Sequence, residues 1–395
     1  MHLTREEEAM LGGEEGPAAA KLLELLVALG EVFGAERLVP VESAHISGVS
    51  YKNLGEAGLG WLVEQADLGA RARIRATLNP AGMDMEFWRE MGVPEEFAEG
   101  QRRVLAAFER MGVEPTCTCT PYLAGHVPGF GSQIAWAESS AVCFSNSVIG
   151  ARTNRESGPT TIASAVTGLA ALYGYRLDEN RRPGAVVEIE ADLDTIMDYS
   201  ALGYVTGKRL GTTVPYFKGL GSPSLESKKA LGAACATSGG IALWHGEGVT
   251  PEAKTMKPYL AGLERLTVNA SDVEEAVARL TGPLEDPIIA LGCPHSSLEE
   301  LGEIAGLVGG RDFGGRLWVF TSRSVYARAE EAGHVEAIRG AGGRVFRDTC
   351  MVVAPLKEMG WTEVATNSFK AGHYMAGMGM RTRMGTIREL LEGRP

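Results

Sequence analysis

The sequence predicts an α/β protein with largely parallel sheets. Short apolar, strand-like segments are followed repeatedly by a polar or glycine-rich turn and then by a helix, which is the pattern of parallel βαβ units. The chain has 395 residues, more than one ordinary core can hold, so we expect two or three α/β domains. Its 51 glycines, roughly twice the average usage, predict many turns in which the backbone approaches a ligand.

The N-terminal third contains several such strand–turn–helix units. Thr4 and Glu7 form a capping box that begins a first helix, and residues 21–33 continue in helical style. Further helices are predicted over 54–65 and 95–111, and strands over 37–42 and 72–78. Ligand groups gather at the carboxyl ends of parallel strands. One sheet edge is therefore predicted to hold the turns that follow these strands, which are Gly48-Val49-Ser50 and Asn79-Pro80, together with Cys119.

The C-terminal third repeats the pattern, whereas the middle, about 130–246, is less regular and rich in small residues. Strands are predicted over 287–291, 316–321, 344–347 and 363–366, and a helix over 325–339. Capping boxes, Ser271 with Glu274 and Ser296 with Glu299, begin helices that end near residues 280 and 308. No linker or repeat marks independent modules, so we place approximate, interleaved regions at 1–130, 131–280 and 281–395.

Composition and charge exclude several classes of function. The net charge is −12 and no run of lysine and arginine stands out, so nucleic acid is not an expected partner. The first ten residues are acidic and do not resemble a signal peptide, and no apolar run reaches the ~18 residues of a membrane helix. We therefore expect a cytoplasmic protein that binds neither nucleic acid nor a membrane.

Three of the six cysteines occupy a special place in the pattern. Cys293 and Cys350 each follow the carboxyl end of a predicted strand, and Cys119 occupies the equivalent place in the N-terminal part. Thiolates that converge there suit an iron–sulfur cluster, although a cysteine in a large protein is more often a small buried residue. Cys143 and Cys235 lie in small, apolar surroundings and are interpreted as packing residues.

Two residues near these cysteines allow alternative interpretations. In a strand, Cys117 shares a face with Cys119, so it is either a ligand or a neighbour of the metal site. His295 follows Cys293 closely, and it either donates a hydrogen bond to the site or caps the next helix.

Further polar residues are candidates for binding or proton transfer. Glu138, beside Ser139, is either a carboxylate whose raised pKa suits proton transfer or a surface residue of a helix. Arg152 and Arg155 either bind a carboxylate or phosphate group or form an interdomain ion pair. Lys370 follows a predicted strand, and it either contacts an anion or is solvated.

Six motifs occur in order along the chain and together resemble the aconitase X family. They are CTPY at 119–122, WAESS at 136–140, NSVIGARTNR at 146–155, GCPH at 292–295, DTCM at 348–351 and TNSFK at 366–370. Six ordered motifs are far more specific than any single one. The sequence departs from the family's pattern at Phe369, where alanine is commoner.

The resemblance implies an aconitase-like fold, in which three α/β/α domains surround a central cleft with a 4Fe-4S cluster that leaves one iron open to substrate. The implied cluster ligands are Cys119, Cys293 and Cys350. The implied catalytic residues are Glu138, Ser139 and Lys370, and the implied substrate contacts also include Gly48, Val49, Ser50, Asn79 and Pro80. The resemblance further implies a large subunit that a separate, small swivelling subunit closes, as a heterodimer or higher assembly.

Two hydro-lyase activities occur in this family, both on small hydroxy acids. One is the dehydration of (R)-5-phosphomevalonate to trans-anhydromevalonate 5-phosphate in the archaeal mevalonate pathway, and the other is the dehydration of cis-3-hydroxy-L-proline. The unfused, two-chain form and the cysteine set are more similar to the first.

Other classes stay open from the residues alone. A zinc lyase or hydrolase would use the cysteines with His295, and a non-catalytic small-molecule-binding α/β protein would need neither metal nor partner. A nucleotide-binding enzyme is disfavoured, because neither GxGxxG after a strand nor GxxxxGKS/T is present.

Overall fold

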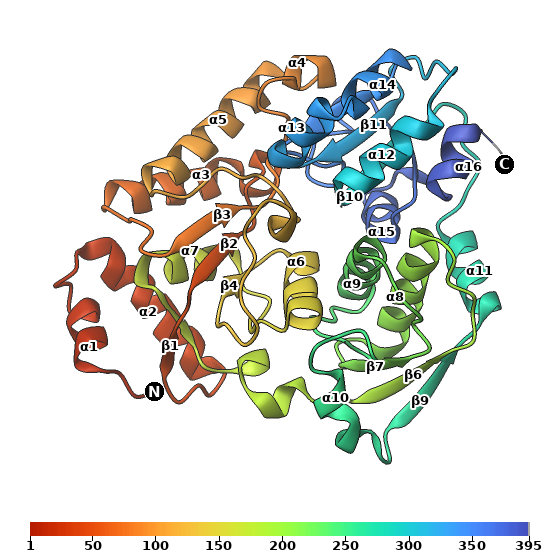
Figure 1. Cartoon of the computed structure of the whole chain (residues 1–395). Helices are drawn as coiled ribbons and strands as arrows, with labels where there is room; N and C mark the ends of the chain where they lie inside the picture. The colour runs from red at the N-terminus through yellow and green to blue at the C-terminus, as the bar shows by residue number, and fades with distance from the viewer. Residues whose placement is uncertain (394–395) are drawn as a thin grey trace.

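The computed structural model describes residues 1–393, in which three parallel sheets and one antiparallel strand pair are flanked by helices. This confirms the predicted α/β class with largely parallel sheets. The three sheets lie in separate parts of the molecule, and the chain visits them in sequence order (Figure 1). No helix in residues 1–393 is long and apolar enough to cross a membrane.

The first sheet has the order β3-β2-β4, with parallel neighbours. Its strands are β2 (Ser43–Ile46), β3 (Arg75–Leu78) and β4 (Ala135–Trp136). Its helices are α1 (Arg5–Leu11), α2 (Pro17–Val32), α3 (Tyr51–Asp67), α4 (Trp88–Met91), α5 (Glu95–Arg110) and α7 (Gly158–Thr167). The predicted capping box of Thr4 and Glu7 is present at the start of α1.

The strand predicted over 37–42 is wrong in extent. Its residues form β1 (Leu38–Pro40), which pairs antiparallel with β5 (Leu169–Ala171), and the strand that leads to Gly48 is instead β2. Pro40 has no N–H group, so it cannot extend a ladder. All four residues of β2 are buried, and its sequence SAHI lacks the apolar run that marks a strand.

The second sheet has the order β8-β7-β6-β9, again parallel, and α8 and α9 lie between it and the middle of the molecule (Figure 1). The small residues noted in this region let the two helices pack closely: a Cβ added at Gly203 of α8 would lie 2.4 Å from the Leu231 carbonyl oxygen of α9. The strands are β6 (Ala185–Ile189), β7 (Pro215–Lys218), β8 (His245–Gly246) and β9 (Glu264–Val268). The helices are α8 (Ile196–Leu210), α9 (Leu225–Ser238), α10 (Ala253–Met256) and α11 (Ala270–Arg279).

The third sheet has the order β12-β11-β10-β13-β14 with parallel neighbours. Both faces are buried, because Trp318 and Phe320 pack in one core while Leu317 and Val319 pack in another. The strands are β10 (Ile288–Ser296), β11 (Leu317–Thr321), β12 (Arg344–Arg347), β13 (Glu363–Thr366) and β14 (Arg381–Met384). The helices are α12 (Leu298–Leu307), α13 (Arg323–Glu331), α14 (His334–Gly340), α15 (Phe369–Gly377) and α16 (Ile387–Glu392).

Several predicted element ends are wrong by a few residues. The helix predicted over 325–339 is divided into α13 and α14 at Gly333, whose φ of 78° is left-handed. The capping boxes of α11 and α12 use Asn269 with Asp272 and Ser297 with Glu300, instead of Ser271 with Glu274 and Ser296 with Glu299.

The three parts meet where α6 (Ser139–Phe144) packs on α9 and where α15 packs on both α8 and α9 (Figure 1). Short 3-10 and π-helical turns connect the larger elements. They are η1 (Pro121–Leu123), η2 (Ser145–Ile149), η3 (Gly174–Arg176), η4 (Asp178–Arg181) and η5 (Lys257–Leu260).

Candidate active site

A cavity of about 240 Å³ lies between the first and third parts of the chain. Most residues predicted from the sequence to form a site lie on its wall: Gly48, Asn79, Pro80, Cys119, Glu138, Ser139, Cys293, Cys350 and Lys370. These residues come from the first and third parts of the chain. Most of them follow strands of the two sheets, as expected for parallel sheets, whereas Cys293 lies within β10 and Cys119 lies in a loop after an isolated bridge at Glu114. The fold therefore brings segments that are far apart in sequence to one cavity.

Val49 and Ser50 lie behind the cavity wall. The Val49 side chain is buried in the first core, and its carbonyl oxygen accepts a hydrogen bond from Gln101 Nε2 at 3.0 Å. Ser50 Oγ donates to the carbonyl oxygen of Val353, which is itself a wall residue, at 2.9 Å. The side chains of Val49 and Ser50 thus hold the turn in place, and a contact with a ligand would have to use their backbone N–H groups.

The three cysteines on the wall are buried free thiols, each 5–6% exposed. Burial raises the pKa of all three thiols, to about 12 for Cys293, and the charge of Cys350 further raises the pKa of both Cys119 and Cys293. The Lys370 ammonium lowers the pKa of all three thiols, but by less than burial raises it. Such thiols stay protonated at neutral pH unless a bound metal displaces the proton.

The donor set fits an iron–sulfur cluster, which takes one thiolate from the protein per iron. Within residues 1–393, no three Cys, His, Asp or Glu side chains converge closely enough to hold a single metal ion. A cluster takes its thiolates on separate irons, so three cysteines need not converge on one ion to hold it. The side-chain oxygen Oδ1 of Asn79, also on the wall, is buried and has no hydrogen-bond partner among these residues, as expected at a ligand site.

Glu138 and Lys370 form a buried ion pair on the wall. Glu138 caps the start of α6, where its Oε2 accepts hydrogen bonds at 2.6 Å from the hydroxyl of Ser140 and from the N–H of Ala141. Lys370, the second residue of α15, places Nζ 2.5 Å from Glu138 Oε1.

The predicted rise in the pKa of Glu138 is wrong. Burial alone would raise it, but the Lys370 ammonium and the hydrogen bonds from Ser140 and Ala141 outweigh burial and hold the pKa below its usual value. Burial lowers the pKa of Lys370, but the charges of Glu138 and of the neighbouring thiols outweigh burial and hold that pKa above its usual value. The resting site therefore holds a carboxylate and an ammonium.

His295 is not a wall residue, and it does not cap α12, because Ser297 does. Both ring nitrogens have protein partners, at 3.0 Å from Thr118 Oγ1 and at 2.8 Å from the Thr349 carbonyl oxygen. Burial lowers the pKa of the ring to about 4, so the imidazole is neutral at neutral pH. With both nitrogens occupied, the ring has no free nitrogen for a zinc ion.

The remaining cysteines lie elsewhere. Cys117 lines a different cavity, together with Arg323 and Asp348, and its φ of 43° shows that it is not in a strand. The prediction that it shares a strand face with Cys119 is therefore wrong. Cys143 and Cys235 are fully buried in the second core, in agreement with the packing role predicted for them.

From the sequence, Arg152 and Arg155 of the 146–155 motif could each bind an anion or form an ion pair. The structure gives the two arginines different surroundings. Arg152 forms an ion pair with Asp178 away from the cavity. Arg155 is an exposed wall residue, and it has no ion-pair partner within residues 1–393.

Sequence reasoning missed several wall residues. They are Ser47, Asn53, Ala137, Val352, Val353 and Tyr374. Tyr374 lies four residues after Lys370 on α15, a helical spacing that was a usable signal. The others are small, apolar or amide residues whose sequence context gave no signal.

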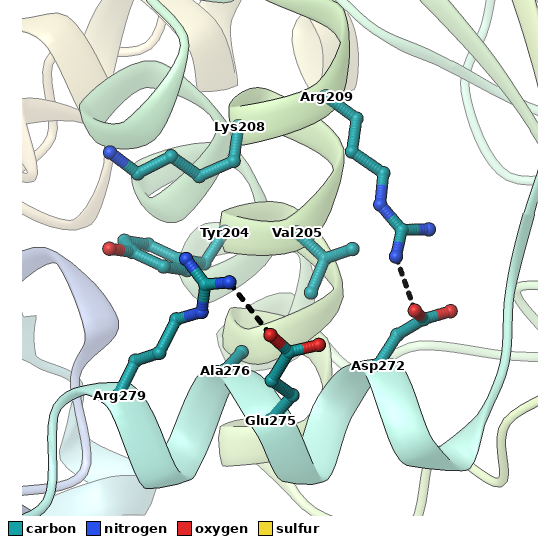
Figure 2. Close-up of a pocket in the computed structure, with 8 residues that line it drawn as sticks. All are labelled: Tyr204, Val205, Lys208, Arg209, Asp272, Glu275, Ala276 and Arg279. Carbon is teal, nitrogen blue, oxygen red and sulfur yellow. Dashed lines mark hydrogen bonds and ion pairs between the residues drawn. The ribbon is translucent and has the colours of Figure 1, made fainter.

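A second hollow of about 240 Å³ lies between α8 and α11, away from the cysteines (Figure 2). Four of its charged groups form two ion pairs, Arg209 with Asp272 and Arg279 with Glu275, and the Lys208 ammonium lies 5.6 Å from the centre of the Tyr204 ring. The described residues that line it include no thiol and no histidine.

The comparison with known families matches the whole architecture. Models of the first, second and third aconitase X domains match residues 1–179, 183–278 and 287–394. The chain belongs to the aconitase X family. A crystal structure of Thermococcus kodakaraensis aconitase X in its holo-form superposes on this aconitase X chain with a TM-score of 0.94, at 43% identity and over 100% of both chains. The aconitase-like fold predicted from the motifs is thereby confirmed.

Two relatives of this aconitase X chain have different names. The phosphomevalonate dehydratase large subunit of Methanothermobacter thermautotrophicus is 49% identical over 96% of this chain and 94% of that protein. The cis-3-hydroxy-L-proline dehydratase of Pseudomonas aeruginosa is 38% identical over 94% of this chain and only 66% of that protein.

Proposed function

We propose that the chain is the large, catalytic subunit of an iron–sulfur dehydratase that converts (R)-5-phosphomevalonate to trans-anhydromevalonate 5-phosphate. The observation that carries the proposal is one cavity wall shared by three buried thiols and the Glu138–Lys370 pair. The archaeal relative named for phosphomevalonate, which matches this chain along nearly its full length, supports the choice of substrate.

When bound by Cys119, Cys293 and Cys350, a 4Fe-4S cluster would supply a Lewis-acidic iron with one open position. Glu138 is ionised, so it is suited to accept the proton from the carbon beside the substrate carboxylate. The Lys370 ammonium stabilises the negative charge that develops on that carboxylate as the proton leaves. Overall, the substrate loses one proton and one hydroxide, which leave as one water.

Of the two directions of proton transfer, Glu138 is suited to accept a proton and not to protonate the departing hydroxyl, because a carboxyl with a lowered pKa carries no proton to give. Glu138 is the only carboxylate among the described wall residues, so the proton acceptor on this chain has no competitor there. Ser139, beside it at the start of α6, is placed to donate a hydrogen bond to substrate.

The remaining wall residues are suited to bind the substrate's anionic ends. Glu138 pairs with Lys370, so Arg155 is the cation of the described wall residues that has no ion-pair partner within residues 1–393. A guanidinium binds phosphate or carboxylate with two parallel hydrogen bonds. The backbone N–H groups of Gly48, Val49 and Ser50 are proposed to donate to the anionic oxygens of the substrate. Asn79 Oδ1, which only accepts, would bind a substrate hydroxyl, and Pro80 would contact the substrate without a hydrogen bond from its nitrogen.

We further propose that a small swivelling subunit covers the cavity and that the working enzyme is a heterodimer or a higher assembly. The name of the archaeal relative describes it as a large subunit, and Arg155 on the cavity wall is exposed in this chain alone.

All six thiols are free, which fits the reducing cytoplasm.

A second candidate, cis-3-hydroxy-L-proline dehydration, is supported by the 38% identity to the Pseudomonas enzyme. The test is anaerobic co-expression with a small-subunit partner, followed by iron, sulfide and dehydration assays on both substrates. We expect iron, sulfide and turnover of phosphomevalonate only. Turnover of hydroxyproline alone would favour the second candidate, and a protein with neither metal nor turnover would indicate a binding protein.

A further inference from the structure

His295 lies in the segment of Cys293 and contacts the segments that carry Cys119 and Cys350. Its ring nitrogens meet Thr118 Oγ1 at 3.0 Å and the Thr349 carbonyl oxygen at 2.8 Å, and these residues directly precede Cys119 and Cys350 in the chain. The backbone N–H of His295 also donates to Cys119 Sγ at 3.2 Å. One residue therefore connects three segments that lie far apart in the sequence.

The partners fix which nitrogen of the ring carries the proton. A carbonyl oxygen only accepts, so Nε2–H donates to Thr349 and Nδ1 accepts the hydroxyl proton of Thr118. Thr118 Oγ1 in turn accepts the backbone N–H of Thr120, on the other side of Cys119, at 3.1 Å. Each polar group of the ring therefore has one partner, and the ring connects the segments that carry Cys119 and Cys350 with its own.

The backbone of His295 is held from another direction as well. Lys229 on α9 donates from Nζ to the His295 carbonyl oxygen at 2.9 Å, and the same ammonium pairs with Glu300 of α12. Both side chains are buried, and Glu300 also accepts the N–H of Ser297 at 2.8 Å. The strand end that carries Cys293 is thus fixed against the middle part of the chain.

We propose that His295 is the positioning residue that sets the spacing of Cys119, Cys293 and Cys350 before a cluster is bound. Its ring bridges the segments of two of these cysteines, and its own strand carries the third. Ligands held in place by outer partners need little reorganisation when they bind metal. The inference rests on the proposed function in one respect, namely that these cysteines bind iron.

The test uses the full chain, prepared anaerobically, with His295 replaced by Ala, Gln or Asn. Gln keeps a donor near the position of Nε2, Asn keeps an acceptor near Nδ1, and Ala keeps neither. His245→Ala is the matched control, because His245 is equally buried and contacts one carbonyl oxygen, that of Arg181 at 2.7 Å, in the second sheet region. The measurements are iron and sulfide per chain, the EPR spectrum, the rate of iron loss to a chelator and the unfolding temperature.

We expect His295→Ala to lose iron about 10- to 100-fold faster than the unmodified chain, with an altered EPR spectrum. His295→Gln and His295→Asn should recover part of the difference, and His245→Ala should lose iron at the unmodified rate even if it unfolds at a lower temperature. A folded His295→Ala chain with unmodified iron retention and EPR spectrum would overturn the inference.

If His295→Ala yields no folded chain, a comparison of iron loss in Thr118→Val and Thr118→Ser tests the inference instead. Faster iron loss in the valine variant, which lacks the hydroxyl, supports the inference, and equal rates in the two variants contradict it. An unmodified chain that binds neither iron nor sulfide would refute the proposed function and this inference together. An unmodified chain that binds a cluster, beside an equally retentive His295→Ala, would refute this inference alone.

Discussion

The Nζ of Lys370 lies 2.5 Å from the Oε1 of Glu138, although 232 residues separate the two in the sequence. Their side chains are 9% and 6% exposed, so neither charge can be solvated if the other is removed. Breaking a buried pair by removing one partner typically destabilises a protein by about 3–5 kcal/mol, because an uncompensated charge is left behind.

Glu138→Gln and Lys370→Met should each lower the free energy of unfolding by about 3–5 kcal/mol, and the double variant should recover much of that loss. All three variants should lose turnover, by about 100-fold or more, because proton transfer or charge stabilisation is missing. Denaturant unfolding and dehydratase assays check both parts. Arg279→Met, which breaks an exposed pair with Glu275, is the control and should leave stability nearly unchanged. A double variant less stable than both single variants would contradict the pairing.

Stability should depend on pH through a histidine pair beside the first sheet. The hydroxyl of Thr77 lies 2.8 Å from His45 Nδ1 and 2.9 Å from His126 Nδ1, and burial lowers the pKa of His45 to about 3 and of His126 to about 4. These values lie below the 6.5 of an unfolded histidine, so the unfolded chain takes up protons first as the pH falls. The stabilisation is complete above pH 6.5 and is lost as the pH falls from there towards 4.

We expect the free energy of unfolding to fall by up to about 5 kcal/mol across this window because of the pair, since one pKa unit corresponds to about 1.4 kcal/mol. Denaturant titrations at several pH values measure the slope. Replacing both histidines with asparagine should flatten it, whereas His2→Gln, at an exposed position, should not. A slope that the double replacement leaves unchanged would assign the pH dependence to other groups.

Arg155→Gln should weaken binding of a phosphorylated substrate. A charge-assisted hydrogen bond contributes about 1.5–3 kcal/mol, so KM for phosphomevalonate should rise about tenfold or more. Arg152→Gln is the matched control, because Arg152 pairs with Asp178 away from the cavity and should leave KM unchanged. Equal KM values in the two variants would remove Arg155 from the substrate site.

The parts of the fold that sequence patterns predicted are those that bury apolar runs. Strands β10 and β11 were found because parallel strands buried on both faces read as continuous apolar segments, and the shorter β12 and β13 were found from the apolar pairs Val345-Phe346 and Val364-Ala365. The strand β2, with the sequence SAHI, was misplaced, and β14, in which exposed Arg381 alternates with buried Thr382, was missed. The capping box of α12 was predicted one residue too early. Ser296 and Ser297 each have a glutamate three residues later, and the sequence does not distinguish them.

The site was predictable in position more than in chemistry. The ends of strands indicated the cysteines, and the motif resemblance supplied the set of candidate residues. The ionisation of Glu138 depends on a lysine 232 residues away, and local sequence carries no trace of it. The role of His295 likewise arises from Thr118 and the Thr349 carbonyl group, which only the folded chain brings to its ring.

The proposed dehydratase chemistry depends on Cys119, Cys293 and Cys350 together holding a cluster. The most direct measurement is iron and acid-labile sulfide per chain after anaerobic preparation, in the unmodified chain and in serine variants of each cysteine. We predict about four of each in the unmodified chain, loss in all three variants and full retention in Cys143→Ala and Cys235→Ala, whose thiols lie in the second core. An unmodified chain without iron, or serine variants that retain the full content, would contradict the account.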